Sequence, residues 1–251
     1  MTNKTIRYTA KVSHAREVSL LGRADLAFWR ERLSAESLVP AERDGKAQIM
    51  IVGATMRFMG IRFTEISFSV LLSRHEEVAG QGGAFLFQAF NSSRLFAWCE
   101  RVLFSTPYLH GNCHVSVSSP ISIQLVVGRE LAFQAKMQAE SRGQRRQPLR
   151  MGEETWEGPV FLPRDCRGRA AKDRFFFAKM KGQTAAYPFV RPEDALSIMP
   201  SQGVEIFRAL LDSGFTGEEW LVREDATHGK SMTYVREKQS CPARPTQHST
   251  P

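Results

Sequence analysis

The feature that most constrains the fold is a series of segments in which apolar and polar residues alternate. The clearest is 63–72, where Ile66, Phe68 and Val70 fall on one face and Glu65 falls on the other. Alternation with a period of two is typical of a β-strand, because successive side chains point to opposite faces. Strand-like segments also occur at 5–12, 47–54, 84–90, 113–127, 130–140, 155–162 and 174–181. The sequence therefore predicts a protein dominated by β-sheet.

Helical patterns are fewer. Apolar residues spaced three and four apart predict helices at 25–33, 93–104 and 203–213, and a helix start is predicted at 192–195. Many strands with a few helices indicate the α+β class. We expect a large, mostly antiparallel sheet bent into a barrel or a sandwich, with a few flanking helices.

The chain of 251 residues, 42% of them hydrophobic, is long enough to bury a substantial core. We expect one domain over 1–237 and a disordered tail over 238–251, which is rich in Pro, Ser and Gln. Apolar runs such as 49–52 are too short to span a membrane, and no apolar stretch follows the charged N-terminus. These features predict a cytoplasmic protein with no membrane partner, and a homo-oligomer is compatible with them.

The net charge of +8 invites a nucleic-acid hypothesis. Much of the basic excess lies in two segments, 142–150 and 164–169, which we interpret as loops of solvated charge. No zinc-finger, RNP-type or recognition-helix pattern accompanies them, so nucleic-acid binding is the weaker alternative. An anionic small molecule is a further partner that this charge suits. The four cysteines form no Cys-x-x-Cys pair, which favours reduced, structural thiols.

One segment stands at a junction where functional groups often lie. Residues 103–110 follow the predicted helix 93–104, contain Pro107, and lead into the predicted strand 113–127. Together with the strand 63–68 and the strand 83–90 that runs into a helix, this succession resembles the acetoacetate decarboxylase-like superfamily over roughly residues 45 to 180. The resemblance is greatest to an uncharacterised bacterial branch that lacks the Schiff-base lysine.

The resemblance implies a bent antiparallel β-barrel or cone around an internal cavity. In the decarboxylases, a lysine just after the proline forms a Schiff base with a β-keto acid. Here Tyr108 occupies that position and Leu109 follows, and the nearest lysines in sequence are Lys46 and Lys136. A Schiff-base decarboxylase is therefore not expected. If the protein is an enzyme, the resemblance favours lysine-independent, lyase-like acid/base chemistry such as enolisation, hydration or a retro-aldol step.

Three residues are candidates for catalysis. Glu65 matches the strand carboxylate that the family points into its cavity, where burial would raise the pKa and suit an acid or base. Tyr108 and His110 bracket the junction and are potential proton donors. The alternatives are a Glu65 that points outward or pairs with an arginine, and a His110 that is only structural.

Three arginines are candidates for binding an anionic ligand. Arg101 lies on the predicted helix, and a guanidinium can hold a carboxylate through two donors. Arg57 and Arg62 flank Gly60 close to the Glu65 strand, at the expected mouth of the cavity. The alternative for Arg101 is a local surface pair with Glu100.

No cofactor or metal is predicted. His110, Cys113 and His114 are close in sequence, but no third-ligand motif accompanies the two histidines. The chain also lacks Gly-x-Gly-x-x-Gly, Gly-Lys-Ser/Thr, Gly-x-Ser-x-Gly and His-Glu-x-x-His motifs.

The main hypothesis is a protein that binds a small anionic or carbonyl compound in an internal cavity. The alternative is a non-catalytic ligand-binding or interaction module. A cavity that lacks polar groups and is filled by phenylalanines would favour that alternative; the candidates are Phe63, Phe85, Phe87 and Phe133.

Overall fold

The computed structural model describes residues 6–73, 82–138, 140–141, 144–165 and 172–237. The predicted tail, 238–251, lies outside the described residues. The three helices are α1 (Leu26–Ser34), α2 (Arg94–Leu103) and α3 (Glu205–Asp212). The strands are β1 (Tyr8–Asp25), β2 (Glu42–Arg43), β3 (Lys46–Phe58), β4 (Ile61–Leu71), β5 (Ala84–Asn91), β6 (Tyr108–His110), β7 (Asn112–Ser116), β8 (Ile121–Val127), β9 (Glu130–Met137), β10 (Glu140–Ser141), β11 (Gln144–Arg145), β12 (Arg150–Asp165), β13 (Lys172–Pro188), β14 (Ala195–Ile198), β15 (Thr216–Ser231) and β16 (Tyr234–Glu237).

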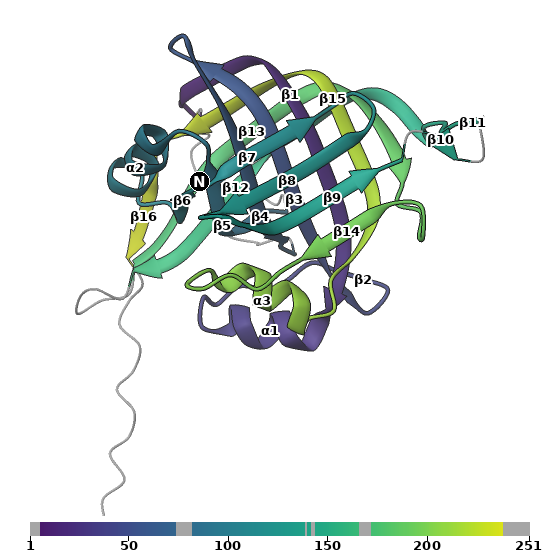
Figure 1. Ribbon diagram of the computed structural model, residues 1–251. Helices are drawn as coiled ribbons and strands as arrows, with labels where there is room; N and C mark the ends of the chain where they lie inside the picture. The colour runs from purple at the N-terminus through teal and green to yellow at the C-terminus, as the bar shows by residue number, and fades with distance from the viewer. Residues whose placement is uncertain (1–5, 74–81, 139, 142–143, 166–171, 238–251) are drawn as a thin grey trace, which may run out of the picture.

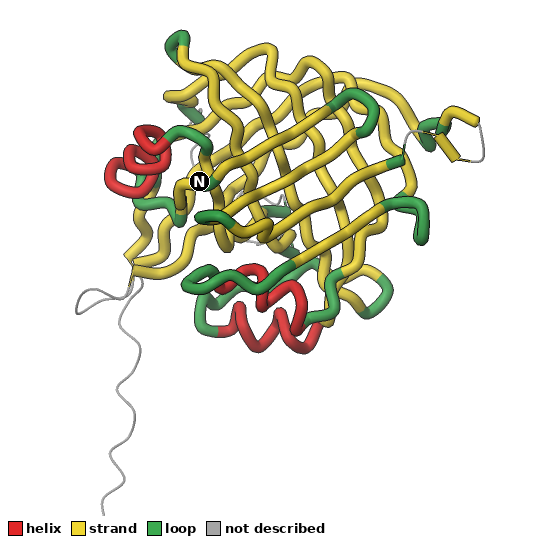
Figure 2. Tube along the Cα trace, in the orientation of Figure 1, coloured by secondary structure: helices red, strands yellow, loops and turns green. Residues whose placement is uncertain are grey.

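The largest sheet bends into a ring (Figures 1 and 2). Its strands follow the order β1-β15-β13-β12-β5-β4-β3-β2, and β3 also pairs with β1, which closes the ring. All of these pairings are antiparallel except β12 with β5. The predicted α+β class, with a bent, mostly antiparallel sheet and a few flanking helices, is confirmed.

A second sheet, β14-β9-β8-β7, packs across the outside of the ring (Figure 1). The main core lies between this sheet, the ring and the helices α1 and α3. At its centre, the ring of Phe68 makes edge-to-face contacts with Phe90, Phe133 and Phe207. Such contacts add to the stabilisation that burial of the aromatic area provides. Helix α1 reaches this core because its stripe of Trp29 and Leu33 is fully buried.

The ring-shaped sheet has an outer face, part of which packs against the second sheet and the helices α1 and α3, and an inner face, which the ring encloses. On β13, residues at odd positions point outward, where Lys181 pairs with Glu153 in solvent. Phe176 and Thr184, at even positions, point inward and are buried. The enclosed face carries its own apolar cluster, which includes Leu86, Tyr108, Val160, Leu162 and Phe176. It is this enclosed face that positions the candidate site.

Several local predictions are wrong. The predicted strand 113–127 is two strands, β7 and β8, joined by a bend at 117–120. No helix begins at 192–195; this segment is a turn that leads into β14. The turn forms because the buried Asp194 carboxylate accepts hydrogen bonds from the Val190 backbone N–H and the Trp220 Nε1–H, both at 3.0 Å. These tertiary partners override the local helix signal.

The interpretation of the basic segments as solvated loops is also wrong for two residues. Arg146 is nearly buried and donates to both carboxylate oxygens of Asp194 at 2.9 Å. Arg164 lies on β12 and its Nε donates to Asp173 Oδ1 at 2.7 Å. Residues 142–143 and 166–169 lie outside the described part of the chain. Because both arginines are held internally, less of the basic excess is free for nucleic acid. Among the described residues, no helix is long and apolar enough to cross a membrane.

Candidate functional site

The candidate site is built around a hydrogen bond between two residues from neighbouring parts of the ring. Glu65 lies on β4, and Tyr108 begins β6, which pairs in parallel with β5. The Tyr108 hydroxyl donates to Glu65 Oε1 at 2.6 Å. Thr106 fixes the approach to β6, because its hydroxyl donates to the Glu100 backbone carbonyl at 2.8 Å. The junction of α2, Pro107 and β6 therefore positions Tyr108 next to the carboxylate of Glu65.

Burial controls the electrostatics of this pair. Removal from water raises the pKa of Glu65, and the nearby carboxylate of Glu100 raises it further; the hydrogen bond from Tyr108 and the charges of Lys230 and His228 oppose this but do not cancel it. Burial and the two carboxylates also raise the pKa of Tyr108 well above its ordinary value. A phenol that stays protonated beside a carboxyl group with a raised pKa can exchange a proton with a ligand.

A lysine from a distant strand completes the site. Lys230, on β15, forms an ion pair with Glu100 of α2. Its Nζ lies 4.6 Å from the ring centroid of Phe176, 4.9 Å from that of Phe104 and 5.6 Å from that of Tyr108. Ammonium groups are attracted to aromatic faces at these distances. The Lys230 side chain is 17% exposed, so it lies at the edge of the site rather than in bulk solvent.

A second polar cluster lies beside the first on the enclosed face. The register of the sheet connects the two clusters. Glu65 of β4 is the cross-strand partner of Ala54 of β3, and Ala54 is also the partner of Glu17 of β1. Glu17 in turn is the partner of Arg223 of β15. Arg223 Nη1 donates to Glu17 Oε1 at 2.5 Å, and its Nε donates to Thr184 Oγ1 at 2.8 Å. Glu65, Glu17 and Arg223 therefore lie in one row across the ring interior, with the apolar Ala54 between Glu65 and Glu17.

His228 joins this second cluster. Its Nε2 lies 2.8 Å from Glu17 Oε2. Burial alone would raise the pKa of Glu17, but His228 and Arg223 outweigh it and lower the pKa to about 2. Burial alone would lower the pKa of His228, but the carboxylate of Glu17 outweighs burial and raises this pKa above its ordinary value. The cluster thus favours a positively charged imidazolium on the same face as Glu65.

The structure brings two of the six predicted site residues together and leaves four apart from them. Glu65 and Tyr108 are in direct contact. His110 ends β6 and is exposed. Arg101 is exposed on α2, and Arg57 and Arg62 are exposed partners in the β3–β4 hairpin. The functional roles of all six residues stay predictions.

The sequence analysis missed Lys230, His228 and Glu17, and misplaced Glu100. Glu100 does not form a pair confined to the helix surface; it turns inward to Lys230. The available signal was the alternate spacing of His228 and Lys230, but none of the strands predicted from the sequence covers this segment, whereas β15 continues to Ser231.

Cys113 is one of the three neighbouring residues, with His110 and His114, that were considered as metal ligands. The Cys113 thiol is half-buried on β7, and burial, with the charge of Glu65, raises its pKa to about 12. It is therefore a protonated thiol at neutral pH. Among the described residues, no group of three or more His, Cys, Asp or Glu side chains is arranged to hold a metal ion.

A ring-like, mostly antiparallel sheet with three helices defines the acetoacetate decarboxylase-like fold, and comparison with solved structures shows this fold for the chain. It is similar to acetoacetate decarboxylase from Legionella pneumophila, with 14% identity, a TM-score of 0.59, and coverage of 94% of this chain and 90% of that one. The enduracididine biosynthesis enzyme MppR, in complex with the condensation product of pyruvate and imidazole 4-carboxaldehyde, has 12% identity, a TM-score of 0.58, and coverage of 94% and 92%.

An acetoacetate decarboxylase-like enzyme from Sphingomonas wittichii is also similar, with 12% identity, a TM-score of 0.57, and coverage of 91% and 92%. No protein-family model matches the chain. A search of curated proteins finds no significant match. At identities this low, the likeness concerns the fold.

Proposed function

We propose that the protein binds a small carbonyl-containing or anionic compound beside Glu65 and Tyr108 and moves protons on it. The observation that carries this proposal is the 2.6 Å hydrogen bond between the two side chains on the enclosed face of the ring. One solved structure of the same fold, MppR, is a complex with pyruvate, which makes pyruvate a suitable probe.

Each group has a defined part in this chemistry. Glu65, with its raised pKa, removes a proton from the carbon next to the carbonyl. When the ligand binds, the Tyr108 hydroxyl turns its one hydrogen bond from Glu65 to the carbonyl oxygen, where negative charge develops. Lys230 supplies a positive charge for the carboxylate of the ligand. The sum is enolisation: the C–H bond breaks and Glu65 takes the proton, the C–H electron pair forms a carbon–carbon double bond, and the π pair of the carbonyl moves to oxygen.

The test is hydrogen exchange of pyruvate in D2O. Wild-type protein should speed the replacement of the methyl protons by deuterium, observed by proton NMR. Glu65→Gln and Tyr108→Phe should each slow this exchange by about 100-fold or more, as expected for loss of a general acid or base. Exchange that is unchanged in both variants would contradict the proposal.

A matched control is present in the chain. Tyr8 also donates a 2.6 Å hydrogen bond to a glutamate, Glu157, but this pair lies on the outer surface of the ring. Tyr8→Phe removes the same kind of interaction away from the site. It should leave the exchange of pyruvate protons at the wild-type rate.

A second candidate function is favoured by the position of Lys230 near Tyr108. Once Glu100 has accepted its proton, the Lys230 amine can attack a carbonyl carbon. Loss of water then leaves a carbon–nitrogen double bond between protein and ligand. This mechanism would differ from the lysine-independent chemistry predicted from the sequence.

Trapping with sodium borohydride separates the two candidates. If an imine forms, borohydride supplies a hydride to it, and intact-protein mass spectrometry should show the added mass of one reduced pyruvyl group. Lys230→Met should abolish this adduct. Lys179→Met should keep it, because Lys179 pairs with Glu157 at 2.8 Å on the outer surface. Proton exchange without an adduct on Lys230 would exclude imine formation with pyruvate.

A further inference from the structure

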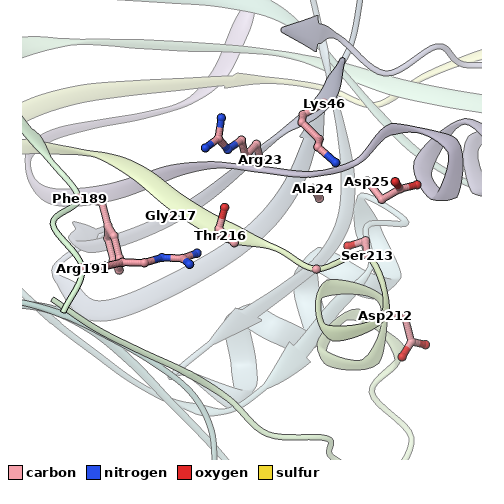
Figure 3. Close-up of a pocket in the computed structure, with 11 residues that line it drawn as sticks. Arg23, Ala24, Asp25, Lys46, Phe189, Arg191, Asp212, Ser213, Thr216 and Gly217 are labelled. Atoms are coloured by element: carbon pink, nitrogen blue, oxygen red, sulfur yellow. The ribbon is translucent and has the colours of Figure 1, made fainter. Parts of the chain in front are cut away.

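A separate pocket lies where β1 ends and β15 begins, next to the C-terminal end of α3 (Figure 3). It has a volume of about 980 Å³, which is large enough for a small molecule. Arg23, which lines it, is six residues further along β1 than Glu17 of the enclosed polar row. The pocket is therefore distinct from the Glu65 site.

One half of this pocket is cationic. Arg23 from β1 and Arg191 from the segment after β13 extend towards opposite sides of the Thr216 hydroxyl (Figure 3). Arg23 Nε lies 3.3 Å from Glu218 Oε1, so its charge is partly balanced. In the part of the chain that the structure describes, Arg191 and Lys46 have no ion-pair partner. Arg191 is thus a cation without an ion-pair partner among the described residues, on a concave surface, whereas Lys46 lies opposite Asp25 in the β1–β3 pair.

The segment that carries Arg191 is held firmly. Asp194, three residues on, is bound by Arg146 and by the Trp220 indole at 3.0 Å. Phe189, two residues earlier, stacks on Trp220 with ring centroids 5.8 Å apart. A site whose charged group is fixed in advance loses less entropy when a ligand binds.

The close approach of Phe189 to the start of β15 also shapes the pocket floor. A Cβ atom at Gly217 would lie only 2.7 Å from the Phe189 ring, so the ring lies directly against the backbone of Gly217. The residue next to Gly217 is Thr216, whose hydroxyl extends into the pocket (Figure 3). The two acidic residues, Asp25 and Asp212, line the side away from Arg191 (Figure 3).

Asp25 is already engaged, because its carboxylate accepts a hydrogen bond from the Phe28 backbone N–H at 2.8 Å and caps α1. It also lies on the side of the pocket away from Arg191, opposite Lys46, so it does not pair with Arg191 (Figure 3). The half of the pocket around Thr216 keeps the guanidinium groups of Arg23 and Arg191 and a hydroxyl (Figure 3). Guanidinium groups bind carboxylates and phosphates through paired hydrogen bonds.

We propose that this pocket is a binding site for a small anion that carries a phosphate or carboxylate group, held by Arg23, Arg191 and Thr216. Lys46 adds positive charge from the neighbouring strand. The site is independent of the function proposed for Glu65 and Tyr108.

The test is a titration of the full chain with inorganic phosphate and, separately, with succinate. Binding is followed by isothermal titration calorimetry at low ionic strength. Wild-type protein should bind at least one of the two, and the stronger ligand identifies phosphate or carboxylate as the preferred group. Arg191→Gln should weaken that binding about tenfold or more, since a charge-assisted hydrogen bond is lost.

Three controls make the result decisive. Arg129→Gln removes an exposed arginine from the β8–β9 turn and should leave anion binding unchanged. Glu65→Gln should also leave it unchanged, which separates this site from the proposed function. Thermal unfolding without ligand should be alike in Arg191→Gln and wild type. Equal anion affinity in Arg191→Gln and wild type, or no binding of either anion to wild type, would overturn the proposal.

Discussion

At the scale of single residues, the enclosed face contains buried charged side chains that lie close to partners of opposite charge. Glu17 is almost fully buried, yet it accepts from Arg223 and lies 2.8 Å from His228. A buried charge is tolerated when its partners are close and its hydrogen bonds are made. The same row leaves Glu65 with fewer compensating contacts, which is why its pKa is raised while that of Glu17 is lowered.

The pairing of His228 predicts a specific dependence of stability on pH. The pKa of His228 is higher in the folded protein than its ordinary value of 6.5. Its contribution is therefore fully present below pH 6.5 and is lost as pH rises through the folded pKa. His228→Asn should lower the free energy of unfolding more at pH 6 than at pH 9, by about 1.4 kcal/mol for each unit of the pKa rise.

Urea denaturation of wild type and His228→Asn at a series of pH values measures this difference. His14→Asn is the matched control, because His14 also pairs with a carboxylate, Asp225, at 3.1 Å, but its side chain is 86% exposed. That variant should have little effect at any pH. Parallel stability curves for wild type and His228→Asn between pH 6 and pH 9 would contradict the prediction.

At the scale of elements, the sequence predicts best where a strand has one apolar face. β4 was predicted almost to its ends because Ile66, Phe68 and Val70 face the main core. The same strand places Glu65 on the other face. Glu65 and Tyr108, the residue after Pro107, were both predicted as site residues, and the structure brings them into contact. This much of the site follows from alternation and the family resemblance.

The second half of β15 was not predicted as a strand, for a related physical reason. This half is polar on both faces, because its inward side chains, including His228 and Lys230, face partners inside the ring rather than an apolar core. Without an apolar face, the period of two is not visible in hydropathy. The partners, Glu17 and Glu100, are more than 100 residues away in sequence, so no local pattern indicates them.

At the scale of the whole molecule, the ring that β3 and β1 complete also depends on one short contact, between β12 and β5. β12 and β5 pair in parallel through only two register positions, Val160 with Ala84 and Phe161 with Phe85. Beside this contact the two backbones come very close. A Cβ atom at Gly158 would lie 2.9 Å from the Gly82 carbonyl oxygen. Closure therefore requires a residue without a side chain at this position.

This closure predicts that Gly158→Ala destabilises the protein. The added methyl group must push the Gly82 backbone away, and overpacking of this kind costs about 1–3 kcal/mol. Gly152→Ala is the matched control on the same strand, because a Cβ atom there would meet no heavy atom within 4 Å. Urea denaturation should give a lower midpoint for Gly158→Ala and a nearly unchanged one for Gly152→Ala.

The same substitution tests whether the candidate site depends on ring closure. Val160, two residues beyond Gly158, packs in the cluster that contains Tyr108 and Phe176, and Phe176 lies against the Lys230 ammonium. Displacement of β12 should therefore slow the pyruvate exchange that we propose for Glu65, even under conditions where Gly158→Ala is fully folded. If Gly158→Ala is as stable as Gly152→Ala and exchanges pyruvate protons equally fast, the contact between β12 and β5 is not what holds the site together.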